Sequence, residues 1–133
     1  MKNSRIIILA FVLYTLLSCS TNEPSNYTTW HCVESSESGS RIYLINIYKA
    51  EKDTNTYLIS NFHNISYEGD YDVIVKKNNN NLTFITEQIG SSQFVIKSPT
   101  GTVNANFTQM TLDYNIYNMD DKSEIGYHVV YSR

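Results

Sequence analysis

Few residues in this chain have side chains that could bind a metal or transfer protons: the sequence has three histidines and two cysteines. His31 and Cys32 are neighbours, and neighbouring side chains in a strand point to opposite faces, so the two cannot share a metal. His63 and His128 are distant in sequence, whereas a zinc site needs three or four converging ligands. We therefore expect no metal site and no resident cofactor.

Catalytic patterns are also absent from the sequence. The acidic segments 68–72 and 120–124 could offer calcium its preferred oxygen ligands, but neither has the spacing of an EF-hand loop, so we interpret both as solvated turns. There is no Gly-x-Ser-x-Gly motif, no glycine-rich phosphate loop and no nucleophile signature around Cys32. We expect no catalytic residue and no enzymatic activity.

The N-terminal segment reads as a targeting signal. Lys2 and Arg5 precede a twelve-residue apolar stretch, 6–17, that is well short of the roughly 20 residues a membrane-spanning helix needs. The stretch ends in Leu-Leu-Ser-Cys at 16–19, which resembles the lipobox of bacterial lipoproteins. The resemblance implies that residues 1–18 are a signal peptide that is removed, and that Cys19 becomes the lipidated N-terminus.

The same resemblance sets the expected location and partners of the mature chain. Ser20 follows the lipobox cysteine where an Asp would favour inner-membrane retention, which implies a lipid anchor in the bacterial outer membrane, on its periplasmic or cell-surface face. Two or three acyl chains on Cys19 would make this attachment stable. If Cys19 is not lipidated, it could instead pair with Cys32 in an oxidising compartment.

Composition narrows the class of the remaining chain. The full sequence carries 10 Lys and Arg against 13 Asp and Glu, and removal of the signal peptide changes the formal charge from −3 to −5. This balance excludes nonspecific nucleic-acid binding, which needs clustered basic residues. Segment 19–28 is polar and contains a proline, so we expect a flexible tether there and a single domain over 29–133.

The domain reads as a series of short strands. The expected strands are rich in Tyr, Ile, Val, Thr and Phe: 29–34, 41–49, 56–62, 72–76, 81–87, 92–97, 102–107, 110–118 and 125–131. In the 110–116 segment, Met110, Leu112, Tyr114 and Ile116 alternate with polar residues, which predicts one dry and one wet face. Short connections favour an antiparallel meander of about eight or nine strands, closed as an up-and-down barrel, with a two-sheet sandwich as the alternative.

Three motifs carry a resemblance to a family. They are an aliphatic-x-Asn-Phe-x-Asn strand end at 59–64, an Asn-aliphatic-Thr-x-Ile-x-x-Gln strand at 81–88 and a Leu-x-Tyr-x-aliphatic strand at 112–116. Together they resemble the small lipoproteins of the Bacteroidota, whose domain is a lipocalin-like (calycin-type) barrel. Most members of that family have no assigned activity, so the resemblance implies a fold and implies no catalytic residues.

The segment 41–48 is apolar on both faces, with Ile42 and Leu44 on one and Tyr43, Ile45 and Ile47 on the other. Such a strand is either covered on both sides or presents an apolar patch. We expect Tyr43, Ile45 and Ile47 to form the contact face if there is one.

The sequence thus favours a non-catalytic, lipid-anchored envelope or surface protein with a structural role or a protein partner. One alternative is a module that binds a small apolar or amphipathic ligand inside the barrel, which an eight-stranded barrel is just wide enough to hold. A lower-ranked alternative is an inhibitor of the lysozyme-inhibitor type.

Overall fold

The computed structural model describes residues 27–64 and 72–133, which form nine strands and one 3₁₀ turn. The elements are β1 (Tyr27–Ser36), β2 (Gly39–Lys49), β3 (Thr56–Ser60), η1 (Phe62–Asn64), β4 (Val73–Asn78), β5 (Asn81–Phe84), β6 (Gln88–Ile89), β7 (Phe94–Val103), β8 (Gln109–Asn118) and β9 (Glu124–Ser132). Strand β1 starts two residues before the expected domain start at 29, and the expected signal peptide and most of the tether lie outside the described residues.

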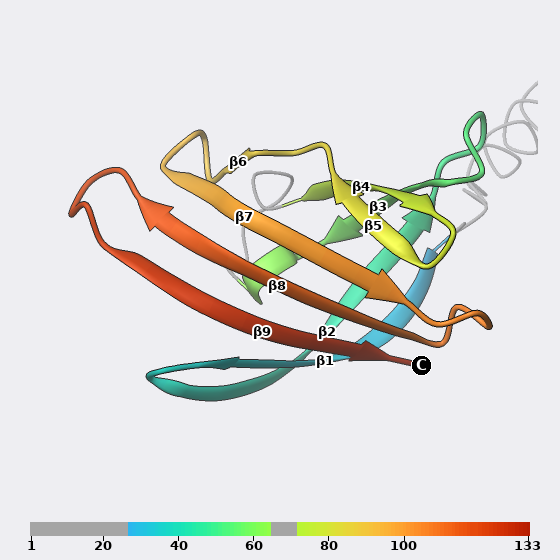
Figure 1. Cartoon of the computed structure of the whole chain (residues 1–133), viewed down its shortest axis with the longest axis horizontal. Coiled ribbons are helices and arrows are strands. Elements are labelled where there is room, and N and C mark those ends of the chain that lie inside the picture. The colour runs from blue at the N-terminus through green and yellow to red at the C-terminus, as the bar shows by residue number, and fades with distance from the viewer. Residues whose placement is uncertain (1–26, 65–71) are drawn as a thin grey trace, which may run out of the picture.

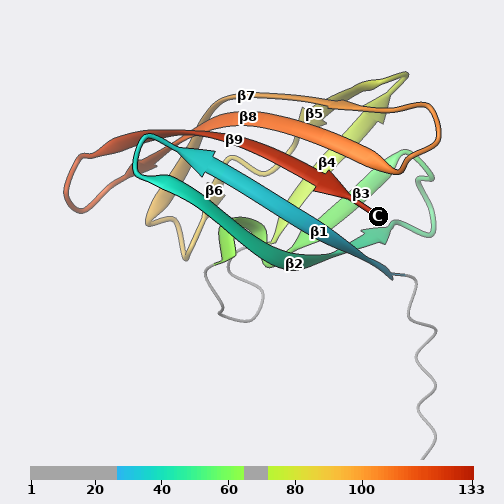
Figure 2. The same ribbon diagram turned by 90° about the horizontal axis from the view of Figure 1, so that it is seen from below.

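The strands form a closed antiparallel barrel (Figures 1 and 2). Their order is β5-β4-β3-β2-β1-β9-β8-β7, and pairing of β5 with β7 closes the ring at eight strands. The two-residue strand β6 pairs with β7 as an addition to the ring. The expected up-and-down barrel is therefore confirmed over the sandwich. Within the described part of the chain, no helix is long and apolar enough to cross a membrane.

The inward faces follow the predicted alternation. Met110, Leu112, Tyr114 and Ile116 of β8 are all buried, while Asp113 between them is exposed. Because side chains alternate along a strand, each strand contributes one set of alternate side chains to the barrel interior. The interior consists of 20 buried hydrophobic residues, with Phe84, Phe94, Phe107 and Tyr127 packed against them.

One end of the barrel is closed by an aromatic cluster. Trp30 of β1 meets Phe107 edge-on at 5.4 Å, and Phe107 stacks on Tyr57 at 4.6 Å. The Arg133 guanidinium lies over the Trp30 ring at 5.3 Å, in cation–π geometry. The chain enters β1 at this end, so the β1–β2 hairpin marks the opposite end, called the mouth below (Figure 2).

The structure corrects the expected break between 97 and 102. Segment 98–101, which contains a Pro and a Gly, separates the strands expected at 92–97 and 102–107, but β7 continues through it as one strand from Phe94 to Val103. The register with β8 shifts between Lys97 and Thr100, and Ser98 has a positive φ of 49°. A bulge accommodates Pro99, which cannot donate to the ladder, without ending the strand. The strand expected at 102–107 does not form, because β7 ends at Val103.

The structure also corrects the expected contact face. Tyr43, Ile45 and Ile47 are buried inside the barrel, whereas Ile42 and Leu44 on the opposite side of β2 are exposed. Both faces are apolar, so hydrophobicity alone gave no orientation. The inward side of β2 is set by its register with β1, in which Trp30 pairs with Ile45.

Candidate functional site

A carboxylate is buried in the apolar interior near the mouth. Trp30, Cys32 and Glu34 occupy alternate positions of β1, so all three side chains point inward. Glu34 is only 1% exposed. A buried carboxylate is costly unless it is paired and hydrogen-bonded, so its partners define a polar site.

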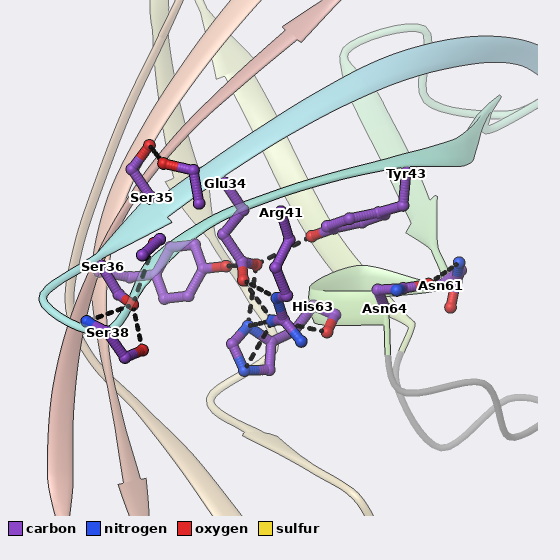
Figure 3. Close-up of polar contacts among 12 residues, drawn as sticks. Glu34, Ser35, Ser36, Ser38, Arg41, Tyr43, Asn61, His63 and Asn64 are labelled. Carbon is purple, nitrogen blue, oxygen red and sulfur yellow. Dashed lines mark hydrogen bonds and ion pairs between the residues drawn. The ribbon is translucent and has the colours of Figure 1, made fainter.

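Four side chains donate to this carboxylate (Figure 3). Arg41, directly opposite Glu34 in the β1–β2 register, donates from both Nε and Nη2 to Oε1. The Tyr43 hydroxyl donates to Oε2 at 2.9 Å, and the Tyr114 hydroxyl of β8 does so at 3.3 Å. His63 Nδ1 lies 2.9 Å from the same oxygen. These residues form the Glu34 cluster.

The 3₁₀ turn η1 brings His63 into the cluster. The chain adopts positive φ at Asn61 (58°), His63 (64°) and Asn64 (49°). Asn and His adopt this region more often than most other non-glycine residues, so the sequence Asn61-Phe62-His63-Asn64 is suited to the turn. The side-chain amide of Asn61 donates from Nδ2 to the Leu44 backbone carbonyl at 3.3 Å, which fixes η1 to β2. The strand-end motif at 59–64 thus builds the turn that positions His63.

The cluster keeps Glu34 ionised. Burial opposes ionisation, but the hydrogen bond and charge of His63, and then the hydrogen bonds of Arg41 and Tyr43, outweigh it and lower the Glu34 pKa to about 2. An ionised carboxylate only accepts hydrogen bonds, so Nδ1 of His63 is the donor. Nε2 is then the ring nitrogen that is not committed to Glu34.

Aromatic rings surround the histidine, and the nearby thiol is inert. The His63 ring meets Tyr127 of β9 at 4.4 Å, edge to face. Burial raises the pKa of the Cys32 thiol to about 12, which leaves it protonated and unreactive near neutral pH. Cys32 is therefore a small core residue, and the acid–base groups of the site are Glu34, His63 and Arg41.

The cluster opens to solvent through a cavity of about 290 Å³ at the mouth. Arg41, with its side chain 45% exposed, and His63 form one wall. The β1–β2 turn forms the other, where the Ser36 and Ser38 hydroxyls lie 2.8 Å apart (Figure 3). The cavity therefore has cationic and hydroxyl groups on facing walls.

A second candidate surface lies outside the barrel. Val33, Ile42 and Leu44 point outward from β1 and β2 and are exposed, Ile42 to 76% and Leu44 to 53%. Val33 pairs with Ile42 on one side and with the half-buried Val130 of β9 on the other, so the four residues are contiguous. We call these four residues the outer patch.

The edge of β2 beside this patch has a strand on one side only. Within the described residues, β3 pairs with β2 only through Asn46–Lys49, so the Gly39–Ile45 half pairs with β1 alone. A serine row, Ser35 opposite Ser40, borders the patch toward the hairpin tip. An exposed apolar patch with a polar rim is typical of a contact surface.

The remaining residues considered from the sequence lie elsewhere. Cys19 and most of the 68–72 segment are outside the described residues. His31 and His128 are exposed on the outer surface, and His128 Nδ1 lies 2.6 Å from the Asp113 carboxylate. In the other acidic segment, Asp121 accepts from the backbone of Ser123, as in a solvated turn. Within residues 27–64 and 72–133, no group of three or more His, Cys, Asp or Glu is placed to hold a metal.

Sequence reasoning missed the Glu34 cluster. A signal was present in the sequence. Trp30, Cys32 and Glu34 are alternate residues of one strand, so Glu34 falls on the same face as the two apolar residues. A charged residue on a core face requires buried partners. Nothing local indicated Arg41 or His63 as those partners, since His63 is 29 residues away from Glu34.

Comparisons with known proteins identify no family for this chain. No protein-family model matches the chain, and no curated protein matches it. Among solved structures, the chain is similar to a redesigned β-barrel at 11% sequence identity, with 83% of this chain and 92% of that chain covered and a TM-score of 0.43. The barrel assignment stands on the strand pairings themselves.

Proposed function

We propose that this chain is a non-catalytic lipoprotein of the bacterial outer membrane that binds a protein partner through the outer patch. The observation that carries the proposal is the contrast between the two faces of β2. The face with Tyr43, Ile45 and Ile47 is part of the buried core, whereas Ile42 and Leu44 are exposed on the opposite face. Exposed large apolar side chains grouped on one surface commonly mark a site of protein contact.

The free half of β2 favours a protein as the partner. An edge with unpaired backbone groups is a template for an added strand, and alternate side chains provide specificity. Ile42 and Leu44 are such alternate side chains beside the Gly39–Ile45 edge. The Leu44 carbonyl already accepts from the Asn61 side-chain amide, so an added strand would pair with the Gly39–Tyr43 part of this edge. A small apolar ligand would bury side chains but would not pair with the backbone there.

The sequence of the N-terminus supports the anchor. The lipobox-like segment at 16–19 and the motifs shared with small Bacteroidota lipoproteins both favour a lipid-anchored barrel. The described chain begins at Tyr27, at the end of the barrel opposite the β1–β2 hairpin. A lipid on Cys19 would therefore place the aromatic end of the barrel toward the membrane and the mouth away from it.

The alternatives are weaker on the same observations. A ligand inside the barrel needs space, but the large inward residues expected from the sequence, such as Met110, Tyr114 and Tyr131, are buried in the core. A lysozyme-type inhibitor is weaker because the paired cysteines of that class are absent when Cys19 carries the lipid, and a Ser-Gly pair in the β1–β2 turn, Ser38-Gly39, is too short a pattern to identify the class.

Intact-mass analysis of the membrane fraction tests the anchor. We expect a chain that begins at Cys19 and carries an acyl increment, and we expect Cys19→Ala to be released or left unprocessed. A soluble, unacylated chain with a Cys19–Cys32 bridge would refute the anchor.

A native gel of detergent-solubilised membranes tests the contact surface. We expect the wild-type protein to migrate in a complex and Leu44→Asp to migrate as the free protein. Ile85→Asp is the matched control, because Ile85 is also 53% exposed but lies outside the outer patch. Loss of the complex in both variants, or no complex in the wild type, would contradict the proposal. Sedimentation of the purified protein as a dimer would instead identify a second copy as the occupant.

A further inference from the structure

We infer that the mouth cavity is a binding site for a small oxyanion, a carboxylate or phosphate group, held between Arg41 and the β1–β2 turn. This site is separate from the outer patch: it lies inside the mouth and involves other residues. The inference rests on how the Glu34 cluster fixes Arg41, on the chemistry of the facing wall and on the size of the cavity.

Arg41 is held by one edge of its guanidinium group. Its Nε and Nη2 atoms donate to Glu34, and Nη2 also donates to the His63 carbonyl at 3.2 Å. Nη1 has no hydrogen-bond partner among the described residues. The guanidinium group is planar and rigid, so fixing one edge also fixes the direction of the free nitrogen. The Arg41 side chain already loses its conformational entropy when the protein folds. Binding a ligand therefore carries a smaller entropic cost.

Charge at the cavity also favours an anion. The ionised Glu34 is buried and saturated by donors from four side chains, so it presents no lone pair to a ligand. Arg41, in contrast, is nearly half exposed and lines the cavity. Glu34 also lines the cavity, but it is 1% exposed, so a ligand meets mainly Arg41 Nη1, which has no partner among the described residues, and His63.

The facing wall supplies neutral donors. Ser36 and Ser38 line the cavity, and their hydroxyls are hydrogen-bonded to each other, which leaves one of the two protons to point toward a ligand. Tyr127 closes one side with its ring, which packs on His63. An oxyanion between these walls would receive a charge-assisted hydrogen bond from Arg41 and a hydroxyl hydrogen bond from the opposite wall.

The cavity volume sets the ligand size. The cavity of about 290 Å³ is many times the roughly 10–15 Å³ that a single water needs. A carboxylate or phosphate group with a few additional atoms fits this space. The ligand class is therefore a small, polar, anionic molecule.

Side-chain NMR of the acylated protein in micelles of an uncharged detergent tests this inference, with inorganic phosphate and acetate as the probes. We expect at least one anion to shift the Arg41 guanidinium and His63 ring signals saturably. Arg41→Lys keeps a positive charge beside Glu34 but has no second nitrogen, like Nη1, to offer the anion. We expect binding about tenfold weaker, the effect of losing one charge-assisted hydrogen bond.

Two further variants separate binding from folding and from general electrostatics. Ser38→Ala removes an exposed hydroxyl without touching the Glu34 cluster, so it tests the site even if Arg41→Lys unfolds the barrel; we expect weaker binding with an unchanged melt. Lys97→Gln removes a cation on β7 that pairs with Glu124, and we expect unchanged binding. The inference is overturned if shifts stay linear up to about 0.1 M anion, where screening dominates, or if Ser38→Ala and Lys97→Gln behave alike.

Discussion

Replacing Glu34 with Gln removes the charge on which the mouth cluster depends and keeps the size of the side chain. In the wild-type protein, the pKa of Glu34 falls from its ordinary value of 4.5 to about 2 on folding, because donors from His63, Arg41 and Tyr43 outweigh the effect of burial. A folded-state pKa below the unfolded-state value means that ionisation stabilises the fold. The variant cannot ionise at this position, so it loses that contribution.

The size of the effect follows from the shift. One pKa unit corresponds to about 1.4 kcal/mol, so a change from 4.5 to about 2 is worth roughly 3 kcal/mol. This stabilisation is present in full above about pH 5.5 and is lost as the pH falls through 4.5 toward 2. By pH 3 about 2 kcal/mol of it is gone. We therefore expect a wild-type advantage over Glu34→Gln of about 3 kcal/mol at pH 7 and about 1 kcal/mol at pH 3.

Urea unfolding followed by fluorescence measures this difference, since Trp30 is the one tryptophan of the chain and is fully buried. Urea is preferable to guanidinium because it leaves ionic strength unchanged. Other carboxylates with lowered pKa, such as Asp53 and Asp121, are present in both proteins and cancel in the comparison. A gap that stays constant between pH 7 and pH 3 would refute the reasoning, because it would mean that the charge of Glu34 does not contribute.

Three further predictions concern the core and are checked by the same urea melts. Leu112→Ala should lower the free energy of unfolding by about 2–5 kcal/mol, whereas Asp113→Ala, on the outer face, should change it by no more than about 0.5 kcal/mol. Equal effects would mean that Leu112 does not point into the core. Gly101→Ala should cost about 1–3 kcal/mol, because the new Cβ would lie 2.6 Å from a methyl group of Leu112; an unchanged midpoint would contradict that contact. Tyr43→Asp combined with Ile47→Asp should unfold the barrel, since both are core residues, and a folded double variant would restore them as a contact face.

The alternation of polar and apolar residues was enough to predict strands, and the short connections between them favoured the antiparallel barrel that the structure shows. In β8, Met110, Leu112, Tyr114 and Ile116 face inward as expected. Successive side chains of a strand point to opposite faces, so a strand with one polar face can place only its apolar face in the core. The connection between the strands expected at 72–76 and 81–87 is rich in Asn, a residue that tolerates positive φ, and it forms a tight turn with Asn79 at a φ of 55°. These features depend on neighbouring residues alone, which is why the sequence was sufficient.

Features that depend on tertiary pairing were not predictable in the same way. The orientation of β2 was lost because both of its faces are apolar, and only its register with β1 places Ile45 inside. The 98–101 segment has the composition of a turn, yet cross-strand pairing with β8 carries β7 through it as a bulge. The Glu34 cluster joins β1, β2, η1 and β8, so its geometry appears only when the barrel closes.

Site-specific photo-cross-linking in cells tests most directly the proposal that the protein acts through the outer patch. A photoreactive amino acid is placed at Leu44, within the patch, or at Ile85, which is equally exposed and lies outside it. We predict one defined adduct with another protein from position 44 and none from position 85. No adduct at position 44, or the same adducts from both positions, would contradict the account.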